Sequence, residues 1–439
     1  MNDAIPIMRC IECRSEVKLY GATKFVCSCG GLYDVCHPKV QYASSLLDVF
    51  DQRAIPNVTN PESMSGVWRF RELVFPSISS SEIVTLGEGL APFWQAGNRL
   101  RKWVGGDLDL WIMPEGLGPT GSFKDNGGTV AISVAKKSGV KTIVCASTGD
   151  TSAMAAAYGA KAGMTCAVVL PKGKVTDVQL AQPIAHGAKV ILIPGNFDDC
   201  MRVVGELVRS ERAFPINSIN PTRIEGHQAT VFLATQFFGW KFPDVFVVPV
   251  GNGSNSSSIG KGIRCLRDNG LVSGEPKIIG AQSKAANPLA HSWEMSYDSD
   301  AGFGVVDPER WAKKYKPVET VGETTATAAL IGNPVSYKKV MREINASRGS
   351  VLTAKEDELN EAVLVAGSDG HFVCPQTGTA IAGLRQAVSR GFVRKGQRVV
   401  LVSTATGLKF SHVPVQFGKN AVIETKTCET EEVAGIIEV

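Results

Sequence analysis

One lysine of this chain stands in surroundings that favour covalent chemistry. Lys124 directly follows Gly121, Ser122 and Phe123, and the glycine-rich stretch EGLGPT precedes them. A surface lysine usually stands among other charged residues, whereas small residues and one aromatic ring indicate an amine held against a flat, bulky partner. Partial desolvation lowers the pKa of such an amine and favours the neutral nucleophile, which can form an imine with an aldehyde cofactor. A single motif of this kind is more often an ordinary loop lysine, so the interpretation depends on three further stretches.

The first of these stretches is GNGSN, from Gly251 to Asn255, which follows the apolar run DVFVVPV. Small residues at a turn from strand to helix expose consecutive N–H groups at the positive end of the helix, and such a turn binds phosphate. The spacing G-x-G-x-x-G is absent, and no acidic strand end lies where a dinucleotide site needs one. A phosphate monoester therefore fits better than a pyrophosphate, although a glycine-rich turn alone is a weak signal.

Two more strand ends carry hydroxyl groups. STGDTSA, from Ser147 to Ala153, precedes an alanine-rich helix. Asp150 or Ser147 is expected to cap that helix, and the same turn can bind a carboxylate with its N–H groups. STATG, from Ser403 to Gly407, ends the last strong strand. A hydroxyl there can pair with a ring nitrogen without protonating it strongly, which limits how far a cofactor stabilises a carbanion. Taken alone, the STATG motif is only a polar strand end.

Arg223 lies in the polar stretch NSINPTRIEGH, before a helix. Its guanidinium suits a second phosphate, and pairing with Glu225 or a surface carboxylate is the alternative. His227 is interpreted as structural. No other histidine has the spacing of a metal site or of a triad with a serine, so a serine hydrolase has little support.

The elements that position these residues alternate between short apolar strands and helices. After Lys124, the stretch 126–139 predicts a helix whose N-terminus disfavours the protonated amine. Three strand-helix pairs follow between residues 141 and 210, and a second set of strands begins at DVFVVPVG. This pattern predicts an α/β protein with two doubly wound open sheets and a cleft between them, in which ligands bind beyond the carboxyl ends of the strands.

Residues 1–45 form a separate piece that contains four paired cysteines. Cys10 and Cys13 make a C-x-x-C, and Cys27 and Cys29 make a C-x-C, with a short strand-like segment between them. Two cysteine-bearing turns on a hairpin match a zinc ribbon, in which four thiolates bind one zinc ion tetrahedrally. The metal stabilises a segment that is too small to form a hydrophobic core. The alternative is a set of reduced, metal-free cysteines. Cys36 is left over.

Composition excludes several classes of protein. The chain has 439 residues, 44% of them hydrophobic and 20% charged, with 45 glycines and a net charge of +4. This composition describes an ordinary α/β enzyme, and so small a charge gives no support to nucleic-acid or membrane-surface binding. No apolar run approaches the roughly 18 residues of a membrane span, and the N-terminus does not have the pattern of a signal peptide. We therefore expect a cytoplasmic protein, whose eleven cysteines form no disulfide framework.

Taken together, the motifs resemble the threonine synthase family in its plant-type branch, which belongs to the fold-type II pyridoxal-phosphate enzymes. The resemblance runs from about residue 80 to 412 and is carried by GPTGSFKDNGGTVAISVA, CASTGDTSAMAAAYGAKAG, NSINPTRIEGHQAT, PVGNGSN, ATAALIGNPVS, FVCPQTGTAIAGL and VVLVSTATGLKF. It implies a large cofactor-binding domain of residues 46–127 and 226–439, and a smaller α/β domain of residues 128–225. It also implies a homodimer, with the ribbon as an N-terminal extension.

The resemblance also implies a role for each site residue. Lys124 would be the Schiff-base lysine, with Phe123 flanking the ring of pyridoxal 5′-phosphate. Asp150 would lie beside the 3′ oxygen of the ring, where the wider fold has Asn, and Thr404 would meet the pyridine nitrogen. The cofactor phosphate would be held by Gly251, Asn252, Gly253, Ser254 and Asn255. The substrate carboxylate would be held by Ser147, Thr148 and Thr151, and the substrate phosphate by Ser218, Arg223 and Asn252.

The reaction implied by the resemblance is conversion of O-phospho-L-homoserine and water to L-threonine and phosphate, a carbon–oxygen lyase reaction of amino-acid biosynthesis. Threonine or serine dehydratase and cysteate synthase are the alternatives within the fold, and a binding module with a vestigial cofactor fold is the alternative outside enzymes. Two positions depart from the family pattern: Thr406 stands where histidine is frequent, and Ser254 occupies the fourth position of a GN-x-GN motif. The branch also allows an effector such as S-adenosylmethionine, which the sequence does not test.

Overall fold

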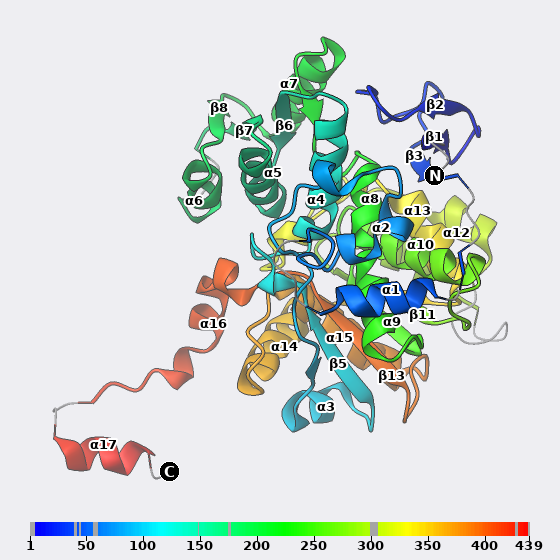
Figure 1. The fold of residues 1–439 in the computed structure, drawn as a ribbon. Coiled ribbons are helices and arrows are strands. Elements are labelled where there is room, and N and C mark those ends of the chain that lie inside the picture. Colours follow the sequence, from blue (N-terminus) through cyan, green and yellow to red (C-terminus); the bar gives the residue numbers. More distant parts are fainter. Residues whose placement is uncertain are drawn as a thin grey trace.

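Two sheets rich in parallel strands and a small antiparallel sheet organise the chain in a computed structural model (Figure 1). The structure describes residues 5–38, 42–43, 45–55, 60–147, 149–173, 177–298, 306–425 and 429–437. The prediction of an α/β fold with two open sheets and a small N-terminal piece is confirmed. The carboxyl ends of parallel strands meet at one edge of a sheet, and this topology gathers the motifs of the sequence.

The larger sheet has six strands in the order β12-β11-β10-β13-β5-β4. Its strands are β4 (Trp94–Gln95), β5 (Asp109–Pro114), β10 (Val245–Pro249), β11 (Lys277–Ser283), β12 (Ser350–Ala354) and β13 (Arg398–Ser403). Only the edge strand β4 is antiparallel to its neighbour. Every residue of β10 is buried, as expected for a strand that is covered by helices on both faces. Helices α10 (Ser254–Asp268) and α15 (Pro375–Ser389) both contact β10 and β11.

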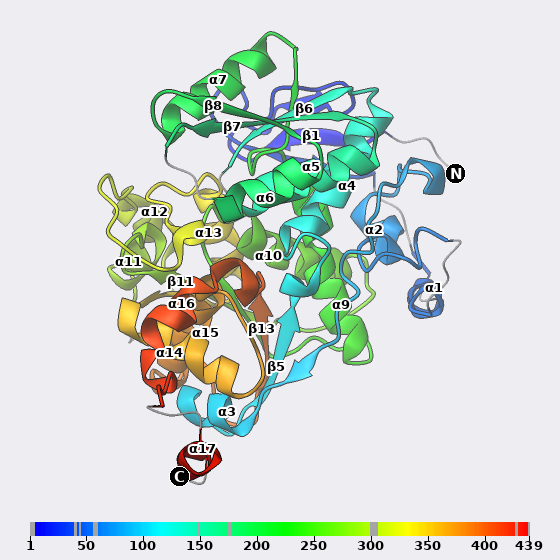
Figure 2. The ribbon, with the colours of Figure 1, turned by 90° about the vertical axis from the view of Figure 1, so that its left-hand side faces the viewer.

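The smaller sheet has four parallel strands in the order β8-β7-β6-β9. They are β6 (Thr142–Ala146), β7 (Thr165–Pro171), β8 (Lys189–Ile193) and β9 (Phe214–Pro215). Helices α5 (Asp150–Lys161) and α7 (Phe197–Arg209) cover its two faces, and α6 (Asp177–Ala185) lies beside α5 (Figure 2).

Helices α4 (Lys124–Lys137) and α8 (Thr222–His227) link the two sheets. α4 packs against α5 and α8, and α8 packs against α10. α4 begins at Lys124 itself, two residues before the start of the predicted helix, and it ends at Lys137 with Ser138 as its C-cap. The amine of Lys124 therefore stands at a helix N-terminus that is enclosed by elements of both sheets.

The N-terminal sheet contains β1 (Ile7–Cys10), β2 (Glu16–Lys18) and β3 (Tyr33–Cys36), all antiparallel. It is fixed to the larger unit by buried charges: the Lys339 ammonium donates to the carbonyl of Tyr33 at 2.6 Å and pairs with Asp34 at 2.7 Å. On the other side, the ring of Phe25 packs edge-on against that of Phe214, with centroids 5.5 Å apart. This N-terminal piece, the ribbon, therefore contacts a helix of the larger unit through Lys339 and a strand of the smaller sheet through Phe214.

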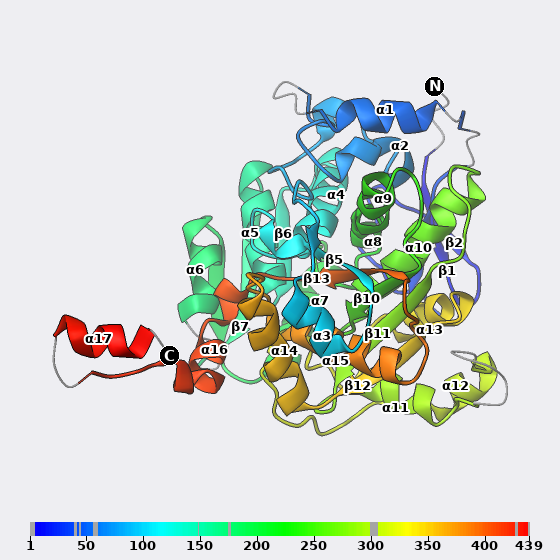
Figure 3. The same ribbon diagram turned by 90° about the horizontal axis from the view of Figure 1, so that it is seen from below.

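The remaining helices complete the larger unit and its edges. They are α1 (Leu46–Arg53), α2 (Arg71–Val74), α3 (Asn98–Val104), α9 (Ala229–Phe237), α11 (Pro288–Glu294), α12 (Pro308–Lys314), α13 (Tyr337–Ala346), α14 (Glu356–Ser368), α16 (His412–Phe417) and α17 (Thr430–Ile437). α17 projects away from the body of the molecule (Figures 1 and 3). Within the described ranges, no helix has the length and apolar character needed to cross a membrane.

Candidate active site and metal centre

The loop that carries Lys124 is fixed by its own acidic residue and by the end of β13. Asp125 is 1% exposed and accepts hydrogen bonds from the backbone N–H and the hydroxyl of Thr120, at 2.9 and 2.6 Å. The N–H of Phe123 donates to the carbonyl of Thr404 at 2.8 Å. This short loop therefore has little freedom, and it brings the lysine motif and the STATG motif side by side.

The amine of Lys124 is partly buried and stands among charges of both signs. Its Nζ lies 3.7 Å from the centre of the Phe123 ring, and no oxygen of the described residues accepts a hydrogen bond from it. Burial lowers the pKa of Lys124 to about 7, and the positive charges of Arg223 and Lys409 act in the same direction. Asp150 and Glu115 oppose this shift. Near neutral pH a large fraction of the amine is therefore the neutral nucleophile.

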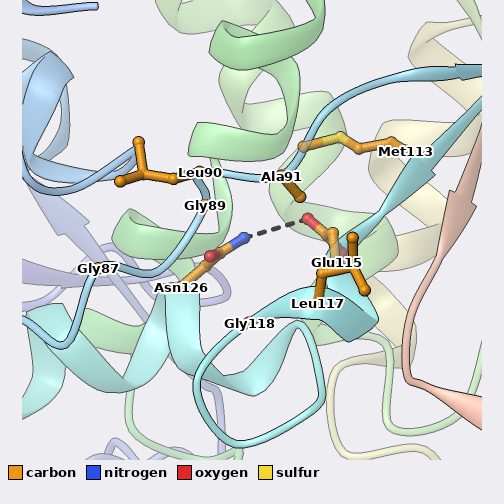
Figure 4. A pocket seen from close by; sticks show the side chains of 9 residues that line it. All are labelled: Gly87, Gly89, Leu90, Ala91, Met113, Glu115, Leu117, Gly118 and Asn126. Carbon is orange, nitrogen blue, oxygen red and sulfur yellow. Dashed lines mark hydrogen bonds between the residues drawn. The ribbon is translucent and has the colours of Figure 1, made fainter. Parts of the chain in front are cut away.

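Glu115 is a site residue that the sequence analysis missed. Its Oε1 accepts from Asn126 at 3.1 Å and from Thr230 at 2.5 Å, while its Oε2 is buried without a partner among the described residues. Burial raises the pKa of this carboxyl to about 7. It lines a cavity of ≈ 50 Å³ together with Gly87, Gly89, Leu90, Ala91, Met113, Leu117, Gly118 and Asn126 (Figure 4). The sequence feature that could have identified Glu115 is its position directly after the apolar strand β5.

The turn from Gly251 to Asn255 joins β10 to α10. Gly253 is the N-cap of α10 with φ of 87°, and a Cβ on it would lie 2.5 Å from the side chain of Val340. Ser254 is the first residue of α10. Asn255 is 4% exposed; its amide makes no regular hydrogen bond in the described part of the chain, and it faces the carboxyl of Glu115, whose pKa it lowers. Asn252 accepts from the N–H of Val335 at 3.3 Å. The turn thus offers a helix N-terminus and an unpaired buried amide, which suit an anion.

The turn after β6 places Ser147 and Asp150 at the start of α5, whose next residue, Thr151, is 9% exposed. Thr148 lies outside the described residues. The expectation that Asp150 or Ser147 caps the helix is wrong, because Gly149 is the N-cap and Asp150 is already helical. The Asp150 carboxylate instead accepts from the ammonium of Lys409 at 2.8 Å. The sequence analysis did not single out Lys409.

Arg223 is a buried cation that meets no carboxylate among the described residues. It is 0% exposed, its Nη1 donates to the carbonyl of Ile216 at 3.3 Å, and its Nε and Nη2 have no partner among the described residues. Burial lowers the pKa of this guanidinium to about 10. Pairing with Glu225 was the alternative reading, but Glu225 contacts His37 and Lys261 instead. An unpaired buried guanidinium is costly, and an anionic ligand would remove that cost.

The loop before α8 is attached to the end of β6. The amide of Asn217 donates to the carbonyl of Ala146 at 2.8 Å and accepts from its N–H at 3.2 Å. Ser218 therefore lies in a turn next to the Ser147 segment. The ring of His227, one helical turn after Arg223, lies 5.0 Å from that of Phe123. Both of its nitrogens are buried without partners in the described residues, and burial keeps its pKa well below the usual value.

Thr404 follows β13 among neutral groups. Its N–H donates to the hydroxyl of Thr377 at 3.1 Å, and its own hydroxyl lies 3.7 Å from the thiol of Cys374. Thr406, which replaces the frequent histidine, accepts from the N–H of Leu408 at 3.3 Å. The surroundings of Thr404 therefore contain hydroxyls and a thiol, and burial raises the pKa of that thiol.

The four cysteines of the ribbon lie together, away from this site. Their sulfur atoms are all within 4.8 Å of one another. Cys10 and Cys29 are 3.5 Å apart, and Cys13 and Cys27 are 3.6 Å apart. A tetrahedral zinc with bonds of about 2.3 Å places its sulfurs about 3.8 Å apart, so the four thiols fit this metal. Cys36 lies on β3, outside the cluster.

Comparisons with known proteins agree on one family. The family model described as pyridoxal-phosphate dependent enzyme matches residues 84–405. The chain is 36% identical to the threonine synthase of Methanocaldococcus jannaschii, over 92% of this chain and 93% of that one. It is also 36% identical to the chloroplastic threonine synthase 2 of Arabidopsis thaliana, over 86% and 70% of the two chains. The solved structure of threonine synthase from Escherichia coli has a TM-score of 0.67 and is 18% identical in sequence. The match covers 98% of this chain and 94% of that one, and it shows the same fold.

The cysteine cluster makes a direct prediction about metal content. Purified under reducing conditions, the protein is expected to contain about one zinc ion per chain. Cys13→Ser should remove most of this zinc and lower the melting temperature, because the ribbon has few buried residues of its own. Elemental analysis by mass spectrometry and a thermal scan measure both effects. Cys36→Ser is the matched control and should keep its zinc; equal zinc in the two variants would contradict the assignment.

Proposed function

The chain belongs to the pyridoxal-phosphate dependent enzymes and, within them, to the threonine synthases, and from this premise we propose how its residues convert O-phospho-L-homoserine and water to L-threonine and phosphate. The observation that carries the proposal is that an amine with a lowered pKa, Lys124, lies within electrostatic reach of a buried cation, Arg223, whose Nε and Nη2 have no partner among the described residues. The first suits covalent attachment of an aldehyde. The second suits a substrate that brings its own phosphate.

The residues present fit the cofactor. The turn at 251–255 has an unpaired buried amide at Asn255 and a helix N-terminus whose Gly253 leaves no room for a Cβ. We propose that these residues and their neighbours Gly251, Asn252 and Ser254 hold its phosphate. Phe123 would flank its ring, Asp150 would face its 3′ oxygen, and Thr404 would meet its ring nitrogen. When bound, pyridoxal 5′-phosphate supplies an aldehyde for amine attachment and an electron sink for carbanions.

Lys124 is the proposed acid and base of the reaction. Its neutral amine accepts the proton at the α-carbon of the substrate and carries protons among the α, β and γ carbons as phosphate leaves the γ-carbon and water adds at the β-carbon. Burial of this amine excludes competing water. The hydroxyl of Thr404 would pair with the ring nitrogen without protonating it strongly, which suits a path that does not trap a fully delocalised carbanion.

The substrate is proposed to bind through its two anionic groups. Ser147, Thr148 and Thr151 would hold the carboxylate at the start of α5. Arg223, Ser218 and Asn252 would hold the phosphate, and the unpaired Nε and Nη2 of Arg223 support this role. A dehydratase acting on threonine or serine has no substrate phosphate, so the buried guanidinium favours threonine synthase over that alternative.

Three broader features are also proposed. Asp150 in place of the fold's usual Asn supports membership of the plant-type branch. We propose a homodimer in the cytoplasm. We further propose a large domain of residues 46–127 and 226–439 and a smaller domain of residues 128–225, in keeping with the separation of the two sheets.

Removing the amine tests the central role. Lys124→Ala should lose the visible absorbance of the cofactor-loaded protein and lower phosphate release from phosphohomoserine by at least about 10²- to 10⁴-fold, because base catalysis and attachment both disappear. Absorbance spectra and a phosphate assay with identification of threonine measure these effects. Lys136→Ala, an exposed lysine on the same helix, should behave as wild type. Full activity in Lys124→Ala would contradict the proposal.

The pKa of Lys124 predicts a pH dependence of cofactor attachment. The neutral amine attacks the aldehyde, and the pKa of this amine is lowered to about 7. The rate of visible-band formation should therefore rise with pH up to about 7 and level off above it. An ordinary lysine amine gains reactivity up to about pH 10.4. A lysine derivative in the same buffers is the control. A protein rate that keeps rising tenfold per pH unit above pH 8.5 would refute a lowered pKa.

Arg223→Met tests the phosphate site because it keeps the volume of the side chain and removes the charge. The KM for phosphohomoserine should rise and kcat/KM should fall about 10- to 100-fold, the size expected for lost hydrogen bonds to a charged group. Arg202→Met, an exposed arginine on α7, is the control. If the main activity of the wild type is ammonia release from threonine and Arg223→Met preserves it, the dehydratase alternative holds instead.

A further inference from the structure

We propose that Lys409 is a positioning residue of this enzyme: it reaches from the six-stranded unit to the four-stranded unit and holds the carboxylate of Asp150 in place beside Lys124. The two residues are 259 positions apart in the sequence and meet at 2.8 Å between Nζ and Oδ1. Their side chains are 19% and 11% exposed, so this is not a surface ion pair. The inference rests on the proposed role of Lys124 as the cofactor lysine.

The position of Lys409 is built into the backbone around it. Lys409 lies in a short 3-10 helix, η6 (Gly407–Phe410), which directly follows the STATG motif. The N–H of Thr406 donates to the carbonyl of Gly121 at 3.1 Å, and the N–H of Gly407 donates to the carbonyl of Phe372 at 3.0 Å. The segment is therefore held on one side by the loop that carries Lys124 and on the other by the segment that leads into α15.

Gly121 leaves the space that the Lys409 side chain occupies. It has φ of 79°, and a Cβ on it would lie 3.1 Å from Cε of Lys409. The aliphatic stem of Lys409 thus crosses directly over the loop of Lys124 before its ammonium reaches Asp150. At this φ a residue other than glycine is strained, so the loop keeps this position free of a side chain.

The pair also determines the charge that Lys124 experiences. Asp150 stabilises a protonated amine at Lys124 and Lys409 destabilises it, so the two charges act in opposite directions. The other groups facing Lys124 are Arg223 and His227 from α8 and Glu115 after β5, while Cys374 faces Asp150. Without Lys409, the carboxylate of Asp150 would be uncompensated in a dry site. The amine of Lys124 would then hold its proton to a higher pH.

The test is a pH titration of the visible absorbance of the cofactor-loaded protein. In Lys409→Met the pH midpoint should move upward by about 1 to 3 units, the size of shift that a nearby opposite charge produces. Lys409→Arg, which keeps the charge, should stay close to the wild-type midpoint. Lys137→Met is the control, because Lys137 forms an ion pair with Glu82 at 3.0 Å outside the site, and the midpoint of this variant should not move.

A double variant shows whether Lys409 acts through Asp150. In the background of Asp150→Asn, adding Lys409→Met should produce little of the upward shift seen in the wild-type background. An unchanged midpoint in Lys409→Met, or a full shift in the Asp150→Asn background, overturns the inference. Circular dichroism checks folding, and Lys409→Gln replaces Lys409→Met if the latter does not fold. A wild-type protein without any cofactor band would instead refute the role of Lys124.

Discussion

The whole site depends on lowering the pKa of one lysine amine by partial burial. Water would keep Lys124 protonated at neutral pH, and a single strong ion pair would do the same. The structure avoids both conditions by enclosing the amine between two sheets and surrounding it with charges of both signs. Arg223 and Lys409 oppose its protonation, and Asp150 and Glu115 favour it, so burial decides the balance. Neutrality at Lys124 is thus a property of the assembled fold and not of the seven-residue motif around it.

The topology supplies this enclosure because each charged group comes from the end of a different strand. Glu115 follows β5, Asp150 follows β6, Lys409 follows β13, and Arg223 lies just beyond β9. In open parallel sheets the carboxyl ends of the strands share one edge. Two such edges face each other here, with α4 between them, so short loops from distant parts of the sequence meet without long excursions of the chain.

The sequence predicted the features that are local and missed those that need a distant partner. The α/β fold, the strand ends and the four-cysteine cluster follow from hydrophobic pattern and spacing. The expected cap at Asp150 was wrong because the sequence shows only local partners for its carboxylate, such as the N–H groups of the next helix. The actual partner, Lys409, is 259 residues away. Glu115 was missed for the same reason, since a buried acid after a strand has no signature until its surroundings are known.

The ribbon shows how a remote element keeps the site free for an anion. Residues two apart on a helix do not face each other, so α8 turns Arg223 toward the site and Glu225 toward the ribbon. There Glu225 meets His37 at 3.1 Å and the ammonium of Lys261, which also donates to the carbonyl of Val35. The helix geometry and these contacts together keep Glu225 away from the guanidinium two residues earlier. The ribbon thereby helps to leave Arg223 unpaired, and an unpaired buried guanidinium is what a phosphate substrate requires.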